Sequence, residues 1–428
     1  MTDASNKARP LGQLSLIALG LNGVVGVGIF FVPSSVAKHL PGWSGALAYA
    51  ATAAACLPVA LAFSRLAPRF DEDGGPYVYA RAAFGPAAAF AMGWLTYVSA
   101  LFSTAAVIRG LAEALTRGMP HDAGVLDPAR LVASATVIAL VALSAAGLRV
   151  AAWTWTGITI AKLVPLIALL GAWAFLAAPE AVPAAVTVTE SAPLGLSHVA
   201  RAAMLVLFTL QGFEVVPVPA GHVRNPRAMS IATVVVLGIA AALYVALHLA
   251  CVRFLPQLAA SQSPLVDVGR AIGGPSFARL IVAGTSVSAL GISFGMVAMT
   301  PRYLSTLGRP DGLGSSLGRT NARGVPMRAL VFTGLAVLVF VQAGSLDELF
   351  ALSSIAVLAQ YGSTAASLVK LGASRQFGLG RGDVALGVLA LAAAASVAVG
   401  ASFGEVLRAS AIVAVGIVVR ALVMRRRS

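Results

Sequence analysis

Charged residues are scarce in this sequence of 428 residues: 11% are Asp, Glu, Lys or Arg, whereas 58% are hydrophobic. A soluble protein of this length carries about 25% charged residues. The shortage excludes a soluble globular domain as the main body of the chain. No polar stretch between the apolar runs is long enough to form such a domain.

Cysteine and histidine are also rare, with 2 and 5 residues. Both cysteines, Cys56 and Cys251, fall inside apolar runs, so a disulfide framework is not expected. The sequence has no metal-ligand spacing, no phosphate-binding loop and no nucleophile beside a general base. We therefore expect no metal site, no cofactor and no enzymatic activity.

Long apolar runs, in contrast, recur along the whole chain, and a run of about 20 residues is long enough to cross a bilayer as a helix. The sequence is thus predicted to be an all-α polytopic protein of the cell membrane with about twelve spans. The predicted spans are 11–36, 44–66, 86–115, 129–147, 150–177, 197–221, 229–252, 276–304, 327–343, 346–370, 383–400 and 403–423.

The formal net charge of +14 is distributed unevenly between the two sides of such a bundle. If the spans alternate in direction, most basic residues fall on one side, including Lys7, Arg69 and Arg425. Far fewer fall on the other side, among them Lys38 and Arg201. Cytoplasmic loops carry the excess of Lys and Arg, which predicts that both termini are cytoplasmic. The basic charge therefore sets orientation, and no nucleic-acid partner is expected.

The first span contains glycines in a stretch that has only to cross the membrane, "GLNGVVGVGIFFVP" at 20–33. Gly20 and Gly23 suit a small-residue face for helix packing. Gly26 and Gly28 do not share a face, because residues two apart on a helix point in nearly opposite directions. Pro33 then suits the first turns of a new half-helix. We expect a break at 26–28, with packing glycines as the alternative.

The sixth span is interrupted in a similar way, by Gly212, Pro217 and Pro219. Interrupted segments at corresponding positions in two halves indicate the binding site of a secondary transporter. Five spans per repeat would give the two repeats opposite orientations. The predicted divisions are a tail 1–10, a first inverted repeat 11–177, a second inverted repeat 197–370, and two added spans with a basic tail at 383–428.

The two interrupted segments resemble those of the amino acid–polyamine–organocation superfamily of permeases. The first-span motif matches "GVGIF" at 26–30, and the sixth-span motif matches Phe208, "GFE" at 212–214 and "RNPR" at 224–227. The segments 76–94 and 301–312 are also similar. One departure is His222, where many members carry an acid. The resemblance implies a five-plus-five inverted-repeat core like that of the leucine transporter, with discontinuous helices 1 and 6.

A broken helix suggests how such a core binds a zwitterion, because its exposed N–H and C=O groups carry about half a charge of each sign. We expect the backbone of Gly26, Val27 and Gly28 to receive the substrate carboxylate. The amino group would bind carbonyls at the ends of the interrupted helices, and Gly212 completes the second break. The carbonyls expected to accept hydrogen bonds from the amino group are those around Val24, Phe208, Thr209 and Gln211.

Three side chains are candidates for gating or coupling. Phe208 matches the superfamily's gating aromatic, with simple bundle packing as the alternative. Lys162 lies in mid-span, where charged residues are functional by default. It resembles the fifth-span lysine that replaces a sodium ion in sodium-independent members. Its partners would be carbonyls of span one and Ser286 or Ser288. The alternative is a lysine that bridges two helices with a fixed charge. Glu214 is either a gate or a structural cap.

These features together predict a secondary active, sodium-independent amino acid transporter that is proton-coupled or an exchanger. No second acid is placed to balance a cationic side chain, which favours neutral amino acids as substrates. A polyamine or organic-amine carrier and a non-transporting amino acid sensor are the alternatives. Neither the particular amino acid nor the oligomeric state follows from the sequence.

Overall fold

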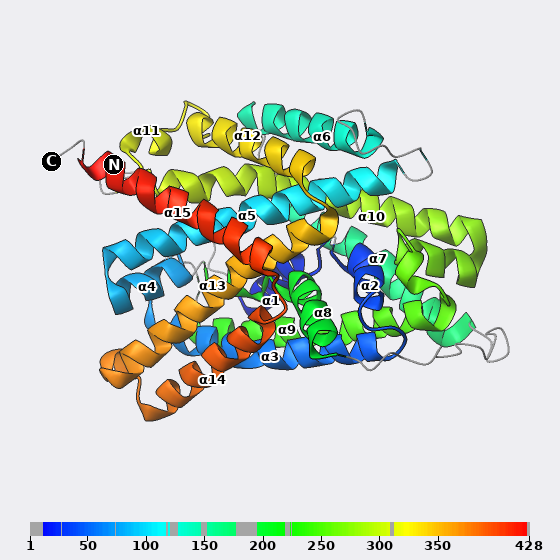
Figure 1. Cartoon of the computed structure of the whole chain (residues 1–428), viewed down its shortest axis with the longest axis horizontal. Coiled ribbons are helices and arrows are strands. Elements are labelled where there is room, and N and C mark those ends of the chain that lie inside the picture. Colours follow the sequence, from blue (N-terminus) through cyan, green and yellow to red (C-terminus); the bar gives the residue numbers. More distant parts are fainter. Residues whose placement is uncertain are drawn as a thin grey trace.

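A computed structural model describes residues 12–26, 28–72, 74–116, 119, 127–146, 152–176, 195–218, 223, 225–308 and 312–425 of the chain. Every regular element in this part is a helix, and the long helices run side by side as one bundle (Figure 1). In chain order the first elements are α1 (Gln13–Val24), α2 (Gly28–Ala37), α3 (Ser44–Leu66), η1 (Ala67–Arg69), α4 (Pro76–Phe84), α5 (Pro86–Leu115), α6 (Pro128–Ala145) and α7 (Ala152–Leu176).

The second half of the chain continues in the same way. It consists of α8 (Leu196–Leu210), η2 (Phe213–Val215), α9 (Pro226–Phe254), η4 (Leu258–Ala260), α10 (Pro264–Thr306), α11 (Ser315–Gly318), α12 (Met327–Ala343), α13 (Leu346–Ala373), η5 (Gln376–Gly378), α14 (Arg381–Ala398) and α15 (Phe403–Arg425).

Local sequence signals explain where many of these helices begin. Proline stands in the first turn of α4, α5, α6, α9 and α10, where its missing N–H costs nothing. The side chains of Asp127 and Asn225 accept hydrogen bonds from the first turns of α6 and α9. A capping box joins Ser345 and Glu348 at the start of α13.

The described helices agree with a multi-pass membrane protein. Eight of them are long and apolar enough to cross a bilayer, or nine if α1 and α2 form one bent span. Three shorter apolar helices, Ile160–Phe175, Leu196–Leu210 and Met327–Ala343, overlap further predicted spans. The number twelve and the inverted repeat stay predictions, although the bounds expected at 86–115 and 327–343 coincide with α5 and α12.

The sixth span is interrupted near Gly212, as its glycine and proline signals predict: α8 ends at Leu210 and is followed by the short 3-10 helix η2. Residues 219–222, and with them His222, lie outside the described part. The helix α10 begins before the predicted eighth span and is bent at Gly273 and Gly274, so that a short first segment precedes Pro275.

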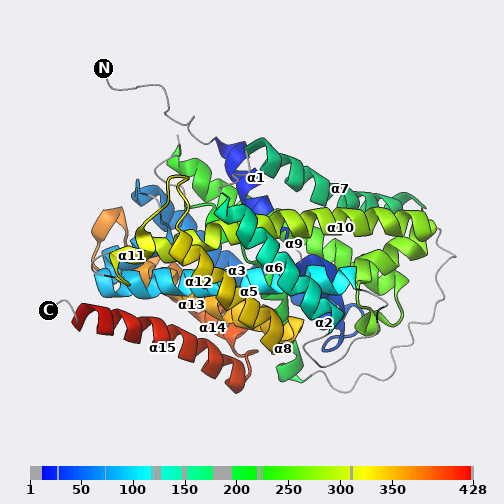
Figure 2. The same cartoon turned by 90° about the horizontal axis from the view of Figure 1, so that it is seen from above.

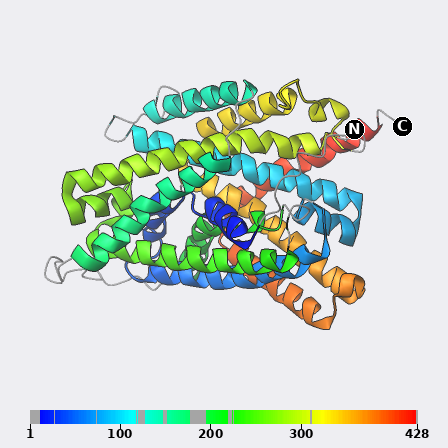
Figure 3. The ribbon, with the colours of Figure 1, turned by 180° about the vertical axis from the view of Figure 1, so that it is seen from behind.

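The centre of the bundle is occupied by α1, shown in blue in Figure 3. It contacts α9, α7 and η2, while α2 contacts α8, α10 and η4. Figure 2 places α7 and α15 at opposite sides of the molecule, with α15 packed on α5 and α13. The first interrupted span is therefore enclosed by helices from both halves of the chain.

Candidate functional site

The first span is broken where the glycine pattern predicts. Helix α1 ends at Val24, α2 begins at Gly28, and the two helices are bent by 49°. The N–H of Gly26 donates to the Val24 carbonyl at 2.7 Å, which closes a tight turn. Val24 and Gly28 are both buried, whereas Val27 lies outside the described residues. The break thus exposes backbone groups in the interior of the bundle.

The chain after α8 lies directly against this break. Gly212 has a φ of +120°, and the backbone turns there instead of continuing as a helix. A methyl group on Gly212 would come 2.5 Å from the carbonyl carbon of Gly23 and 2.7 Å from the Val24 nitrogen. The two backbones therefore touch, and only glycine combines this conformation with this approach.

Glu214 explains why α8 stops. In a continued helix the Gly212 N–H would bond to the Phe208 carbonyl four residues earlier. It donates instead to the Glu214 carboxylate at 2.7 Å, and the same carboxylate oxygen accepts from the Tyr361 hydroxyl at 2.9 Å. Glu214 therefore holds the unwound segment and deprives the Phe208 carbonyl of its helical donor.

Phe208 covers the start of α2. Its ring stacks on Phe350 with centroids 4.2 Å apart, and it is 6% exposed. A methyl group on Gly28 would come 2.9 Å from the Phe208 ring and 3.1 Å from the Thr209 side chain. The beginning of α2 and the end of α8 are therefore neighbours in the buried interior, and the Thr209 hydroxyl itself donates to Val206 at 2.7 Å.

Lys162 is fully buried in α7 and reaches the end of α1. Its ammonium donates to the backbone carbonyl and to the side-chain oxygen of Asn22, both at 2.8 Å. A cation at this position also suits the negative end of the α1 dipole. The expected contact between Lys162 and a carbonyl of the first span is thus present.

The two serines proposed as partners of Lys162 lie in different surroundings. Ser288 is buried and its hydroxyl has no hydrogen-bond partner among the described residues. One turn away on α10, Gly284 packs against Pro165 of α7, which is nearly one turn from Lys162. Ser286 instead lines a small cavity with Phe30 of α2.

The sequence reasoning missed a polar cluster around Gln211. The Gln211 amide donates to Ser103 at 3.1 Å and to Ser353 at 3.0 Å, and these two hydroxyls are 2.7 Å apart. The cluster joins the end of α8 to α5 and α13. A serine within an apolar helix is a weak signal, because its hydroxyl often bonds to its own backbone.

Ion pairs connect the helices at the end of the bundle that we predict to face outward. Lys38 pairs with Asp347 at 3.4 Å, Ser35 donates to Asp347 at 2.6 Å, and Arg201 forms a two-pronged pair with Glu405 at 2.7 and 2.8 Å. These contacts join α2 to α13 and α8 to α15.

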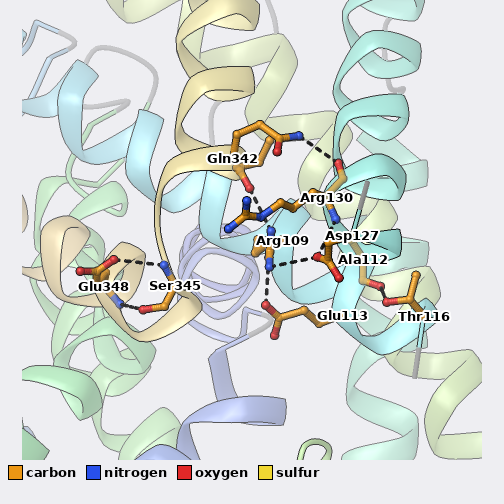
Figure 4. A network of polar contacts seen from close by, with 10 residues as sticks. Arg109, Ala112, Glu113, Thr116, Asp127, Arg130, Gln342, Ser345 and Glu348 are labelled. Atoms are coloured by element: carbon orange, nitrogen blue, oxygen red, sulfur yellow. Dashed lines mark hydrogen bonds and ion pairs between the residues drawn. The ribbon is translucent and has the colours of Figure 1, made fainter. Parts of the chain in front are cut away.

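A second outer cluster holds α5, α6 and α12 together. Figure 4 shows Arg109 between Glu113, at 2.9 Å, and Asp127, at 3.6 Å. Arg109 also donates to the Val341 carbonyl at 3.1 Å, and Gln342 donates to the Arg130 carbonyl at 3.3 Å. These contacts lie away from the two breaks and brace the surrounding frame.

No three His, Cys, Asp or Glu side chains of the described residues come together in a way that could hold a metal ion. The arrangement around the breaks instead offers helix ends of opposite sign. Such ends can bind a small molecule that carries both charges without a buried counter-ion.

Comparison with known proteins gives a consistent result. A family model described as amino acid permease matches residues 11–421. An uncharacterized transporter of Mycobacterium tuberculosis is 31% identical over 373 residues, covering 85% of this chain and 80% of the relative. An arginine/ornithine antiporter of Pseudomonas aeruginosa is 27% identical, covering 79% and 72%. The vacuolar cationic amino acid transporter 2 of Arabidopsis thaliana is 24% identical, covering 85% and 60%.

Proposed function

Because this chain belongs to the amino acid permease family, we propose that it is a sodium-independent secondary transporter of amino acids that works by alternating access. One observation carries the proposal: the buried start of α2 at Gly28 lies beside the end of α8 at Phe208 and Thr209. A helix start favours a carboxylate and a helix end favours an ammonium, so the pair fits the backbone of an amino acid.

Substrate contacts are assigned on the same basis. The N–H groups of Val27 and Gly28 are proposed to bind the carboxylate, and that of Gly26 joins them when its bond to the Val24 carbonyl opens. The amino group is proposed to bind carbonyls of Phe208, Thr209 and Gln211, with Phe208 favoured because it has lost its helical donor. The ring of Phe208 would then shift as the substrate enters, since it now covers Gly28.

Lys162 is proposed to take the place that a sodium ion has in related folds. Its contacts with Asn22 hold the end of α1, and loss of that tether would free the first span to move. Proton coupling through Lys162 and substrate exchange both fit this role. Glu214, held by Gly212 and Tyr361, is proposed to set the shape of the sixth-span break.

Neutral amino acids are the proposed substrates, because one oxygen of the Glu214 carboxylate already accepts from two protein donors, the Gly212 N–H and the Tyr361 hydroxyl. The competing candidate is a cationic amino acid or an organic amine. The relatives from Pseudomonas aeruginosa and Arabidopsis thaliana, an arginine/ornithine antiporter and a cationic amino acid transporter, favour it. A cationic substrate would have to share the Glu214 carboxylate with these donors, through its second oxygen or in place of one of them.

Uptake by purified protein in proteoliposomes tests the proposal. We expect counterflow of at least one labelled amino acid from a panel of neutral and cationic members, independent of sodium and altered by a pH gradient or by internal substrate. Saturable binding without any flux would support a sensor instead, and neither binding nor flux would refute the proposal.

The membrane arrangement is proposed to follow the repeats 11–177 and 197–370, with 383–428 outside the core and both termini cytoplasmic. This arrangement is tested by replacing Lys38 and Lys370, one at a time, with Cys. Both residues are exposed, and they are predicted to lie on opposite sides of the membrane. The native Cys56 and Cys251 are buried and give a low background. An impermeant maleimide added to intact cells should label position 38 and leave position 370 unmodified.

A further inference from the structure

The carbonyl groups at the end of α1 need partners, because the last turn of a helix has no N–H groups ahead of it. The Leu21 carbonyl accepts from the Val25 N–H at 2.9 Å, and the Asn22 carbonyl accepts from Lys162. The Val24 carbonyl accepts two hydrogen bonds, from the Gly26 N–H at 2.7 Å and from the Tyr244 hydroxyl at 2.8 Å.

Tyr244 belongs to α9, which packs along α1, and its side chain is fully buried. A carbonyl oxygen has two lone pairs, and both donors to Val24 come from the protein. The Val24 carbonyl is therefore already satisfied and poorly placed to accept a third bond from a substrate ammonium. Its direction, on the other hand, is fixed from both sides.

We propose that Tyr244 is a positioning residue for substrate binding, which rests on the proposed transport function. By holding the Val24 carbonyl, its hydroxyl fixes the direction in which the chain leaves α1. The Gly26 N–H bonds to the same carbonyl, so Tyr244 also fixes the turn that leads to α2, and with it how the N–H of Gly28 at the start of α2 meets a carboxylate. The substrate amino group binds elsewhere, at the end of α8.

A neighbouring tyrosine provides a matched comparison. Tyr49 of α3 is as fully buried as Tyr244, and the two rings meet edge to face with centroids 6.4 Å apart. The Tyr49 hydroxyl has no hydrogen-bond partner among the described residues. Replacing either residue by Phe removes one hydroxyl from the same packed region, but only Tyr244→Phe removes a bond to the broken helix.

The experiment compares wild type, Tyr244→Phe and Tyr49→Phe in proteoliposomes. The probe is whichever of L-alanine, L-leucine and L-arginine the wild type takes up, with its carboxamide as a competitor that lacks the carboxylate. We expect Tyr244→Phe to raise KM for the amino acid about fivefold, because a change of that size corresponds to the loss of one buried hydrogen bond. The inhibition of Tyr244→Phe by the carboxamide, and the maximal rate of this variant, should stay close to the wild-type values.

A loss of general packing would weaken the amino acid and the carboxamide equally, and that result would overturn the inference. Tyr49→Phe should match wild type in both measurements. If wild type transports and the two variants behave alike, the role of Tyr244 is refuted while the proposed function stands. If wild type neither binds nor moves any of the three amino acids, the proposed function itself fails.

Hydrogen exchange provides a second measurement that does not depend on transport. In detergent, a peptide covering 25–30 should exchange its amide hydrogens faster in Tyr244→Phe than in wild type, since the turn after Val24 is held less firmly. The same peptide should be unchanged in Tyr49→Phe. Equal exchange in all three proteins would also overturn the inference.

Discussion

The backbones of Gly23 and Gly212 lie against each other, so that the break after α8 is pressed onto the last turn of α1. A methyl group on Gly23 would in turn meet the Gly212 carbonyl oxygen at 3.0 Å. This contact joins the two interrupted segments directly, without an intervening side chain. The two breaks are therefore packed as one unit in this structure.

Gly212→Ala tests this contact. The added methyl group would overlap the Gly23 backbone, and the φ of +120° is unfavourable for any residue with a Cβ atom. We expect a lower melting temperature in detergent and loss of uptake. Gly238→Ala in α9 is the control, because nothing lies within 4 Å of that position and alanine favours a helix. Equal behaviour of the two variants would contradict the close approach.

The position of the first break could be predicted from the sequence because two glycines spaced by one residue cannot share a helix face. The long spans followed from their apolar length, as α5 and α12 illustrate. The ending of the sixth span was less accessible. Its proline and glycine signals indicate an interruption, but the exchange of a backbone bond for the Glu214 carboxylate depends on a tertiary arrangement.

The hydrogen-bond partners within the candidate site could not be predicted from the sequence either. Gln211, Ser103 and Ser353 lie far apart in the chain and carry no spacing signal. Tyr244 and Tyr49 are both tyrosines in apolar helices, yet only one of their hydroxyls reaches the broken helix. The packing of α9 and α3 around α1 decides which buried hydroxyl finds a hydrogen-bond partner. The periodicity of the sequence contains no information about this packing.

Lys162→Met is expected to impair coupled transport. The substitution keeps an unbranched apolar chain but leaves both oxygens of Asn22 without the ammonium that now binds them. The loss of hydrogen bonds to a charged donor costs about 1.5–3 kcal/mol, which corresponds to roughly a tenfold to hundredfold loss of uptake. Uptake with and without a pH gradient is the measurement. The control is Lys370→Met, at an exposed position of α13, which should retain coupled uptake. Full coupled activity of Lys162→Met would exclude the role in coupling that is assigned to Lys162.

Glu405→Gln is expected to destabilise the protein much more than Glu348→Gln. Both glutamates follow a serine by three residues at a helix start and receive its backbone N–H, at 2.9 and 3.1 Å. They differ in the exposure of their ion pairs. In the first pair the side chain of Arg201 is 23% exposed and that of Glu405 4%, whereas in the second pair Arg408 is 52% exposed and Glu348 35%. Breaking a buried pair is costly, whereas exposed pairs contribute little.

For Glu405→Gln we expect a loss of about 2 kcal/mol, below the usual range for fully buried pairs because Arg201 is partly exposed. Thermal unfolding of the two variants in the same detergent measures the difference. A large effect would also mean that α15, outside the predicted repeats, is firmly attached to α8 in the sixth span. Similar melting temperatures for both variants would show that the pair is energetically unimportant.

His39 is expected to make stability depend on pH. It lies just beyond α2, and its ring centroid is 6.0 Å from that of His198. Burial lowers the pKa of His39, and Arg201, His198 and Lys38 lower it further, whereas Asp347 raises it. The folded protein therefore favours neutral His39, and the unfolded chain binds a proton more readily at this residue.

The sign of the effect follows from that difference in pKa. Above a pH of about 6.5, the ordinary value for histidine, His39 is neutral in both states and contributes nothing to the pH dependence. As the pH falls below that value the unfolded state gains protons first, and the stabilisation is lost until His39 in the folded state is protonated as well. His39→Gln should therefore show a smaller drop in melting temperature between pH 8 and pH 5 than wild type. A drop as steep in the variant would leave His39 without a part in the pH dependence.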